Sequence, residues 1–321
     1  MKKLNLLIGA IGFAFSSLAS AQAYPSKPVK IIVSFPPGSV IDTTARTIGQ
    51  KLTDLWGQPV TVDNRPGGGG TGTVGAEALA KSPADGYTWM LQPNSVMVIG
   101  PQMVKTPFDV FRDFAPVGQV AITPFLLAVA TTVPANTVAE LVAYGKANPS
   151  KLNYGSSGNG SPQHLGGELL KRNAGIEMVH VPYKGANQAI TDLLGGRLQV
   201  FIGAAGSLFP HIKDGKIKML ASAGSRRLGA YLNVPTIAET LPGTEVDAWL
   251  GVYMPTGAPR EAIAKAGSDI TAVLNVGETR NTLSAQGIEV VTTSPDALTR
   301  LMRDDYARWG KLIREAGIKA D

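Results

Sequence analysis

Apolar positions along the chain alternate between short continuous runs and helical spacings of three or four residues. Residues 29–35 are largely apolar, which is typical of a strand buried on both faces. A short loop follows, and apolar side chains then recur at helical spacing from 41 to 55, with Gly57 at the end of the expected helix. The order of strand, loop and helix repeats along the chain and predicts an α/β fold with mainly parallel sheets.

Two series of such units predict two domains. Pro124 interrupts a long apolar stretch and predicts the point where the chain crosses from one series to the next. A later extended segment predicts the return. We expect a first domain of residues 24–124 and 249–321 and a second domain of residues 125–248, each with enough apolar content for its own core.

The first 23 residues have the pattern of a secretory signal peptide. Lys2 and Lys3 precede a mostly apolar segment, 4–18, and residues 21–23 (Ala-Gln-Ala) form a small-x-small cleavage site. The apolar segment is too short for a convincing membrane span, and no later segment is long and apolar enough to cross a bilayer. We therefore expect a periplasmic protein whose mature chain begins at Tyr24.

Composition narrows the possible chemistry. The chain has no cysteine, which excludes disulfides, thiol catalysis and thiolate metal sites. Without the signal peptide the 30 basic residues fall to 28 against 24 acidic ones, a mild net charge of +4. These basic residues are scattered, so nucleic acid is not an expected partner. His164, His180 and His211 have no metal-ligand spacing, and no metal is expected.

A glycine-rich turn at 64–75 separates an expected strand from an expected helix. Such a turn lets a ligand approach the backbone and presents N–H groups to an anion. Residues 70–75 also match the dinucleotide pattern Gly-x-Gly-x-x-Gly. However, the next strand ends in 91–95 without the acid that a ribose needs, and Asp85 lies before that strand. A loop for a small anion is the favoured interpretation, and a purely structural turn is the alternative.

Two further loops carry polar groups ahead of helices. In 36–42, Ser39 either donates to a carboxylate or caps the helix, and Asp42 either binds a ligand amine or hydroxyl or complements the helix start. In 155–161, hydroxyls and backbone N–H groups either hold a carboxylate or form a surface loop with a helix cap. His164 lies in the first turn of the following helix, where it either donates to an anion or has a structural role, the more common one for a single histidine.

The sequence holds no arrangement typical of an enzyme. It has no Gly-x-Ser-x-Gly elbow, no Ser-His-Asp order of a hydrolase and no paired carboxylates at a plausible acid/base site. We expect a binding protein without a cofactor. The alternative is an exported α/β enzyme that acts on a small carboxylic acid.

Eight short motifs follow one another along the mature chain, at residues 24–29, 35–38, 62–68, 82–88, 158–165, 181–185, 210–216 and 234–239. In this order they resemble the substrate-binding proteins of tripartite tricarboxylate transporters, the Bug receptors. The resemblance implies a two-domain periplasmic-binding-protein-like (Venus-flytrap) fold with a ligand cleft between the domains. It also implies a receptor that delivers a small carboxylate to a two-component membrane permease. We expect a monomer, and a sensory receptor without a transport partner is the alternative.

Carried over to this sequence, the family's binding loops imply a set of ligand contacts: Phe35, Gly38, Ser39, Asp42, Gly69, Gly70, Thr71, Asn94, Ser156, Ser157, Gly158, Ser161, His164, Tyr183, Gly203 and Ala204. Two positions depart from the family pattern. Ser39 stands where a second glycine is common, and no Asp follows the strand that ends at Gly203. Without that acid the wall is more neutral, so we expect a ligand without an amine, an aromatic or aliphatic carboxylate.

Overall fold

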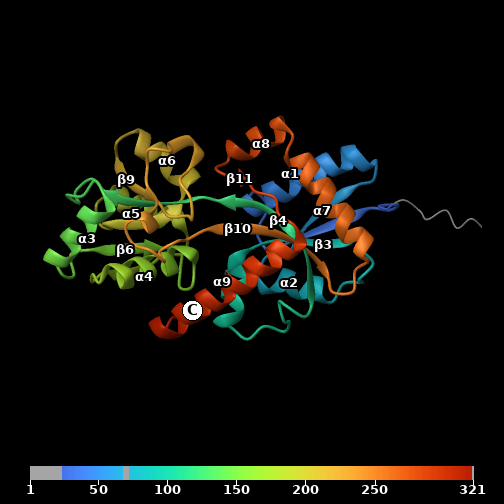
Figure 1. Cartoon of the computed structure of the whole chain (residues 1–321), viewed down its shortest axis with the longest axis horizontal. Helices are drawn as coiled ribbons and strands as arrows, with labels where there is room; N and C mark the ends of the chain where they lie inside the picture. The colour runs from blue at the N-terminus through green and yellow to red at the C-terminus, as the bar shows by residue number, and fades with distance from the viewer. Residues whose placement is uncertain (1–23, 68–71, 320–321) are drawn as a thin grey trace, which may run out of the picture.

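The computed structural model describes residues 24–67 and 72–319. Within them the chain forms two α/β bodies that lie side by side along the long axis of the molecule (Figure 1). Each body is built on its own sheet, so the α/β fold class expected from the sequence is confirmed. In the described part of the chain, no helix has the length and apolar character needed to cross a membrane.

The first body holds a six-stranded sheet among the described residues, in the order β11-β4-β10-β3-β1-β2. Its strands are β1 (Val29–Val33), β2 (Val60–Asn64), β3 (Thr88–Pro93), β4 (Phe114–Thr123), β10 (Ala248–Pro255) and β11 (Glu289–Val290). Its helices are α1 (Val40–Trp56), α2 (Thr73–Ala80), α7 (Arg260–Leu274), α8 (Gly277–Ser284) and α9 (Pro295–Ala316). The short helical turns η1 (Ser95–Ile99) and η2 (Gly100–Gln102) follow β3.

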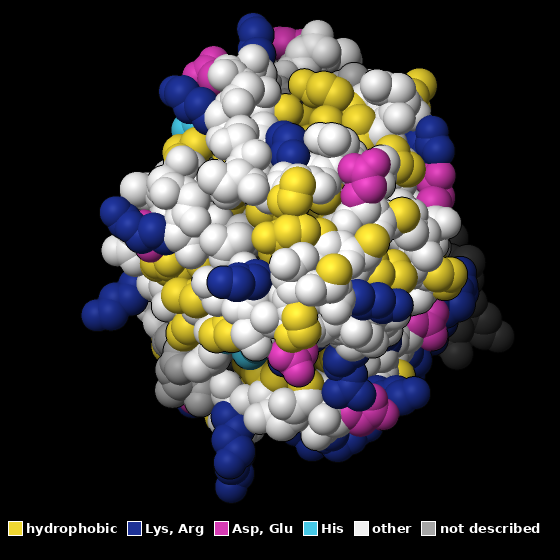
Figure 2. Space-filling model, turned by 90° about the vertical axis from the view of Figure 1, so that its left-hand side faces the viewer, with side chains coloured by type: hydrophobic (Ala, Val, Ile, Leu, Met, Phe, Trp, Pro, Cys, Tyr) yellow, Lys and Arg dark blue, Asp and Glu magenta, His cyan; other side chains and the backbone are white. Residues whose placement is uncertain are grey.

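The second body holds a five-stranded sheet among the described residues, in the order β7-β6-β8-β5-β9. Its strands are β5 (Phe125–Ala130), β6 (Asn153–Ser156), β7 (Val179–Pro182), β8 (Val200–Ala204) and β9 (Ile217–Ser222). Its helices are α3 (Val138–Ala147), α4 (Pro162–Ala174), α5 (Ala186–Leu194) and α6 (Ala205–Lys213), with short turns η3 (Gly229–Tyr231) and η4 (Ile237–Glu239). On its end face, Lys and Arg side chains are scattered among apolar and neutral groups (Figure 2).

Both sheets are mixed, and the expectation of mainly parallel sheets is wrong. β1 pairs in parallel with β2 and β3, and β6 with β7 and β8, as the repeated strand-loop-helix pattern predicts. β4, β5 and β10 instead pair antiparallel with their neighbours. The direction of these strands is set by their passage between the bodies rather than by a helical crossover.

β4, β5 and β10 connect the two bodies, and we call them the crossing strands. β4 ends at Thr123 and β5 begins at Phe125 in the other sheet, with Pro124 alone between them. β10 brings the chain back to the first sheet after β9 (Figure 1). The exact domain bounds expected from the sequence stay a prediction.

The core explains the continuous apolar run at 29–35. Val29, Ile31 and Val33 pack into the cluster that includes residues of α1 and α7. Ile32, which points to the other face of the sheet, belongs to the second cluster. β1 is therefore covered on both faces, as its sequence predicts.

The helices that border the space between the bodies begin where their caps predict. Ser39 Oγ accepts the Asp42 N–H at 3.3 Å at the start of α1, and Gly57 ends that helix in the left-handed conformation. Ser161 Oγ accepts the His164 N–H at 3.3 Å at the start of α4. These caps fix the ends of the loops that form the site.

Candidate binding cavity between the two bodies

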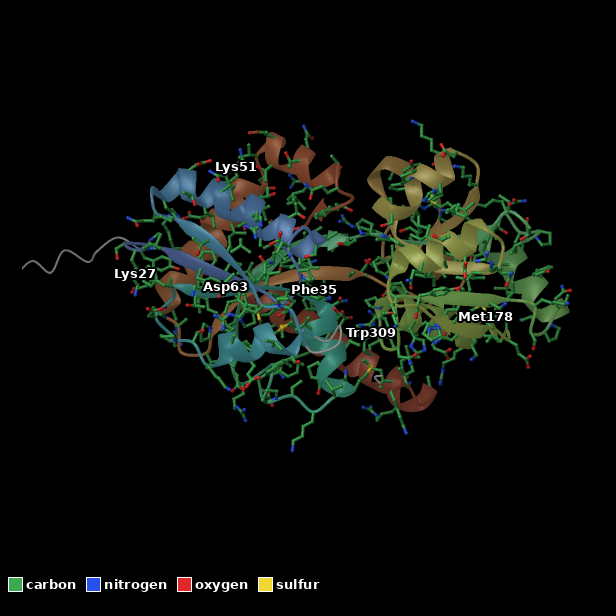
Figure 3. All side chains as sticks on the ribbon, turned by 180° about the vertical axis from the view of Figure 1, so that it is seen from behind. Lys27, Phe35, Lys51, Asp63, Met178 and Trp309 are labelled. Carbon is green, nitrogen blue, oxygen red and sulfur yellow. The ribbon has the colours of Figure 1, made fainter. Side chains whose placement is uncertain are left out.

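A cavity of about 500 Å³ lies between the two bodies, and we call it the ligand cavity. Figure 3 shows Phe35 on the side of the first body that faces the second. The cavity lining is drawn from both bodies and from the crossing strands: Phe35, Val40, Ile41, Pro93, Ser95, Gly100, Met103, Thr123, Phe125, residues 157–163, Tyr183, Lys184, Ala248 and Leu250. Its volume suits a small organic molecule.

The crossing strands form the floor of the ligand cavity. Thr123 and Phe125 line it, whereas Pro124 between them lines a second cavity of about 330 Å³, which we call the rear cavity. Ala248 and Leu250 line the ligand cavity in the same alternating way. Since successive side chains of a strand point to opposite faces, the two cavities lie on opposite sides of the crossing strands.

Helices α1, α4 and α5 all begin at the ligand cavity. Val40 and Ile41 open α1, Ser161 caps α4, and Lys184 lies directly before Gly185, the cap of α5. A helix start carries unpaired N–H groups and a partial positive charge. Among the described lining residues, Lys184 is the single charged side chain, and no carboxylate is present. The cavity is therefore suited to an anion.

The loop after β6 turns two of its hydroxyl-bearing residues to the ligand cavity. Ser157 and Ser161 line it, and their Oγ atoms donate to Gln163 Oε1 at 3.1 Å and to the Gly158 carbonyl at 2.8 Å. Ser156 does not line it. Its Oγ is fully buried, accepts the Gly158 N–H at 3.1 Å and lies 2.7 Å from His180 Nε2. Ser156 thus shapes the loop from behind.

His164 supports this loop from below rather than from within the cavity. It is buried, and its Nδ1 accepts the Gly160 N–H at 3.0 Å. Its ring is parallel to that of His180, with centroids 3.8 Å apart, and the Tyr154 ring stacks on His180 at 4.9 Å. Because Nδ1 accepts a hydrogen bond, the ring proton is on Nε2 in this arrangement. Of the two roles left open for His164, this geometry favours the structural one, and donation to an anion stays a prediction.

Asp42 also acts on loop structure. Its Oδ2 accepts the Gly38 N–H at 2.8 Å and Arg46 Nε at 3.0 Å, and its Oδ1 accepts Asn64 Nδ2 at 2.8 Å. Burial alone would raise the pKa of Asp42, but the hydrogen bonds from Arg46, Gly38 and Asn64 outweigh it and hold the pKa below its usual range. The carboxylate is ionised and almost fully buried, and its hydrogen bonds connect the loop at Gly38 with the end of β2 at Asn64.

The glycine-rich turn is described at its ends, and Gly69, Gly70 and Thr71 lie outside the described residues. At Gly72, which is left-handed, a Cβ would lie 2.5 Å from a methyl group of Val96. At Gly75 it would lie 2.2 Å from Ser34 Oγ. These two glycines therefore have a packing role, as in the structural interpretation of the turn.

The remaining expected residues lie around the ligand cavity in different ways. Tyr183 lines it and donates its hydroxyl to Asp192 at 2.7 Å. Asn94 lies between two lining residues and donates to the Asp247 carbonyl at 2.6 Å, while its buried Oδ1 has no hydrogen-bond partner among the described residues. Gly38, Ser39, Gly203 and Ala204 are not among the lining residues.

Several lining residues were not expected from the sequence. Met103 directly follows η2, and Phe125 and Leu250 lie in the crossing strands; these three apolar residues carry no polar signal in the sequence. Met103 reaches the opposite wall, since a Cβ on Gly160 would overlap its side chain. Lys184 belongs to segment 183–185, which the family resemblance already places among the binding loops, although only Tyr183 of that segment was named as a ligand contact.

Two α/β bodies joined by crossing strands, with a cavity between them, define a two-domain solute-binding protein. The family described as tripartite tricarboxylate transporter family receptor (TctC) matches residues 44–318, and the chain belongs to this family. The resemblance stated from the sequence motifs is thereby confirmed. Its members are receptors.

Individual relatives match over nearly the whole chain. Protein BugT of Bordetella pertussis is 33% identical over 319 residues, which cover 98% of this chain and 97% of BugT. An R. palustris protein solved with adipate is 34% identical, with a TM-score of 0.77 over 92% of this chain and 99% of that one. MatC from Rhodopseudomonas palustris, solved with bound malate, is 27% identical, with a TM-score of 0.73 over 90% of this chain and 100% of MatC.

Proposed function

We propose that this protein is a periplasmic solute receptor that binds a small organic carboxylate in the ligand cavity and delivers it to a membrane permease of the tripartite tricarboxylate type. One observation supports a negatively charged ligand. Three helices, α1, α4 and α5, begin at the ligand cavity, and Lys184 lines it. No Asp or Glu is among its described lining residues. Helix starts and a cation favour a negative charge. The adipate and malate of the related structures are small carboxylates of this kind.

The expected site residues fall into two groups, those that line the ligand cavity and those that hold its loops in place. Phe35, Ser157, Gly158, Ser161 and Tyr183 are the expected residues that line the cavity, and we propose that they contact the ligand. Ser39, Asp42, Ser156 and His164 act through the loops that they cap, bridge or support. We retain Gly69, Gly70 and Thr71 as proposed contacts of the glycine turn.

Ligand capture then involves closure of the two bodies over the ligand cavity. The crossing strands provide the connection about which they move, and contacts made to the ligand from both walls favour the closed form. The signal-peptide pattern at 1–23 and the family membership support delivery of the ligand in the periplasm.

A thermal-shift titration of the mature chain, from Tyr24 onward, tests this function. Adipate, malate and aromatic carboxylates are compared with neutral amides of the same carbon skeletons. A carboxylate at about 100 times its Kd stabilises the folded chain by about 2.7 kcal/mol, which raises Tm by about 5 °C or more. The amides are expected to leave Tm unchanged. If no carboxylate raises Tm and one of them is instead turned over, the receptor function is wrong.

A further inference from the structure

Lys184 occupies a distinctive place in the ligand cavity. It follows β7 directly, and its main chain is fixed because its N–H donates to Gln188 Oε1 at 3.2 Å and the preceding Tyr183 N–H donates to the Ser156 carbonyl at 3.1 Å. The residue is exposed, so it lies at the mouth of the cavity rather than at its floor.

No described carboxylate neutralises Lys184. The nearest acid on the following helix, Asp192, accepts the Tyr183 hydroxyl at 2.7 Å and pairs with Arg197. Hydrogen bonds from Tyr183 and Arg197 lower the pKa of Asp192, whose charge is committed to these two partners. Among the described residues, the ammonium of Lys184 has no hydrogen bond or ion pair, although it lines the cavity.

Apart from Lys184, the described lining combines apolar and uncharged polar side chains. Apolar side chains come from both bodies and from the floor: Phe35, Val40, Ile41, Met103, Phe125 and Leu250. Hydroxyl and amide side chains line the cavity as well: Ser95, Thr123, Ser157, Asn159, Ser161 and Gln163. Among the described lining residues, a negatively charged end of a ligand can therefore meet an opposite side-chain charge only at Lys184.

We propose that Lys184 is a specificity-determining residue, which selects a second negative charge at the end of the bound carboxylate that faces the cavity mouth. This inference rests on the proposed function and adds the charge requirement of the second end. A carboxylate there gains an ion pair with Lys184, a methyl group gains none, and an ammonium group is repelled.

Three ligands with the same six-carbon chain test the proposal: adipate, hexanoate and 6-aminohexanoate, measured by calorimetry. The wild-type chain is expected to bind them in that order of decreasing affinity. Lys184→Gln should weaken adipate about fivefold, as for an exposed ion pair, and leave hexanoate nearly unchanged. Lys184→Glu should weaken adipate about 20-fold and strengthen 6-aminohexanoate, so that the preference between these two ends reverses.

Lys151→Glu is the matched control, because Lys151 is exposed on the same body and does not line the cavity. It should leave all three affinities unchanged, and the unliganded Tm of each variant should equal that of the wild type. An unchanged ratio of adipate to 6-aminohexanoate affinity in Lys184→Glu would overturn the role of Lys184 alone. Failure of every carboxylate to bind the wild-type chain would instead overturn the proposed function.

Discussion

At the scale of single residues, Asp42 shows how a buried charge can shape a binding site without facing its ligand. Its two oxygens join the N–H of Gly38, the guanidinium of Arg46 and the amide of Asn64. The carboxylate thereby ties the loop after β1 to the end of β2. Of the two interpretations that the sequence left open for Asp42, this geometry favours support of the helix start and its loop.

Replacing Asp42 tests this role. We expect Asp42→Asn to lower the free energy of unfolding at pH 7 by about 2–3 kcal/mol, since hydrogen bonds to a charged group are lost. The folded pKa of Asp42 lies below its ordinary value, so its contribution is complete above the unfolded pKa of about 3.9 and is lost as pH falls toward the folded pKa. Urea unfolding at pH 7 and pH 3 should therefore show a smaller difference between the two chains at pH 3 than at pH 7.

Asp54→Asn is the control for this prediction. Asp54 lies on the same helix, is exposed and bonds only Gln50 among the described residues. Its replacement should change stability by less than about 0.5 kcal/mol at either pH. An Asp42→Asn chain as stable as the wild type at pH 7 would contradict the supporting role.

At the scale of elements, the β6–α4–β7 unit positions the loop that faces the ligand. β6 and β7 pair in parallel so that Tyr154 lies opposite His180, and the start of α4 brings His164 onto the same stack of rings. The tight approach of α4 depends on Gly167, where a Cβ would lie 2.1 Å from Cε2 of Tyr154. The stack, the helix and the loop therefore form one packed unit.

We expect Gly167→Ala to destabilise the chain although it raises helix propensity. Alanine favours the helix by about 1 kcal/mol, but its Cβ overlaps the buried Tyr154 ring, and such overpacking costs about 1–3 kcal/mol. Displacement of the ring should also shift the loop and weaken carboxylate binding. Chemical unfolding and calorimetry measure the two effects. Gly277→Ala lies at the start of α8, where a Cβ meets no neighbour, so it should keep stability equal or raise it by up to about 1 kcal/mol and leave binding unchanged. A stabilised Gly167→Ala chain would refute the packing argument.

The same unit shows what sequence can and cannot predict. The caps at Ser39 and Ser161 are local signals, so α1 and α4 begin where they were expected. His164 and His180 seemed unrelated because they lie far apart along the chain, and only strand pairing brings them together. The prediction of parallel strands was wrong for the crossing strands because their pairing, too, is set by residues far apart along the chain. Their direction depends on which sheet receives them, and periodicity carries no information about that.

At the scale of the whole molecule, the crossing strands separate the ligand cavity from contacts at the rear. There, Gly206 at the start of α6 lies against Gly287, which precedes β11, so closely that a Cβ on Gly287 would be 2.8 Å from the Gly206 Cα. Gly287 lines the rear cavity, as does Ala205 beside Gly206, and Arg226 pairs with Glu289 between the same two bodies at 2.6 Å. Movement about the crossing strands that closes the ligand cavity should therefore open these rear contacts.

A side chain inserted at the rear is expected to favour closure at the front. A Cβ on Gly206 would lie 3.2 Å from the Gln286 carbonyl, and Gly206 has no left-handed conformation that forbids a side chain. We expect Gly206→Leu to push α6 from the 286–287 segment and to raise carboxylate affinity about fivefold, because less free energy is then needed to reach the closed form. Small-angle scattering of the unliganded chain should show a smaller radius of gyration than that of the wild type.

Gly206→Ala provides a graded control. Its smaller side chain should push less on the 286–287 segment and give a smaller gain in carboxylate affinity. The rear contacts act as a stop only if affinity and compaction rise together through the series glycine, alanine, leucine. Weaker binding in Gly206→Leu, at unchanged Tm, would mean that the rear contact supports the closed form instead. In that case the bodies do not pivot about the crossing strands, and the two cavities do not open and close in opposition.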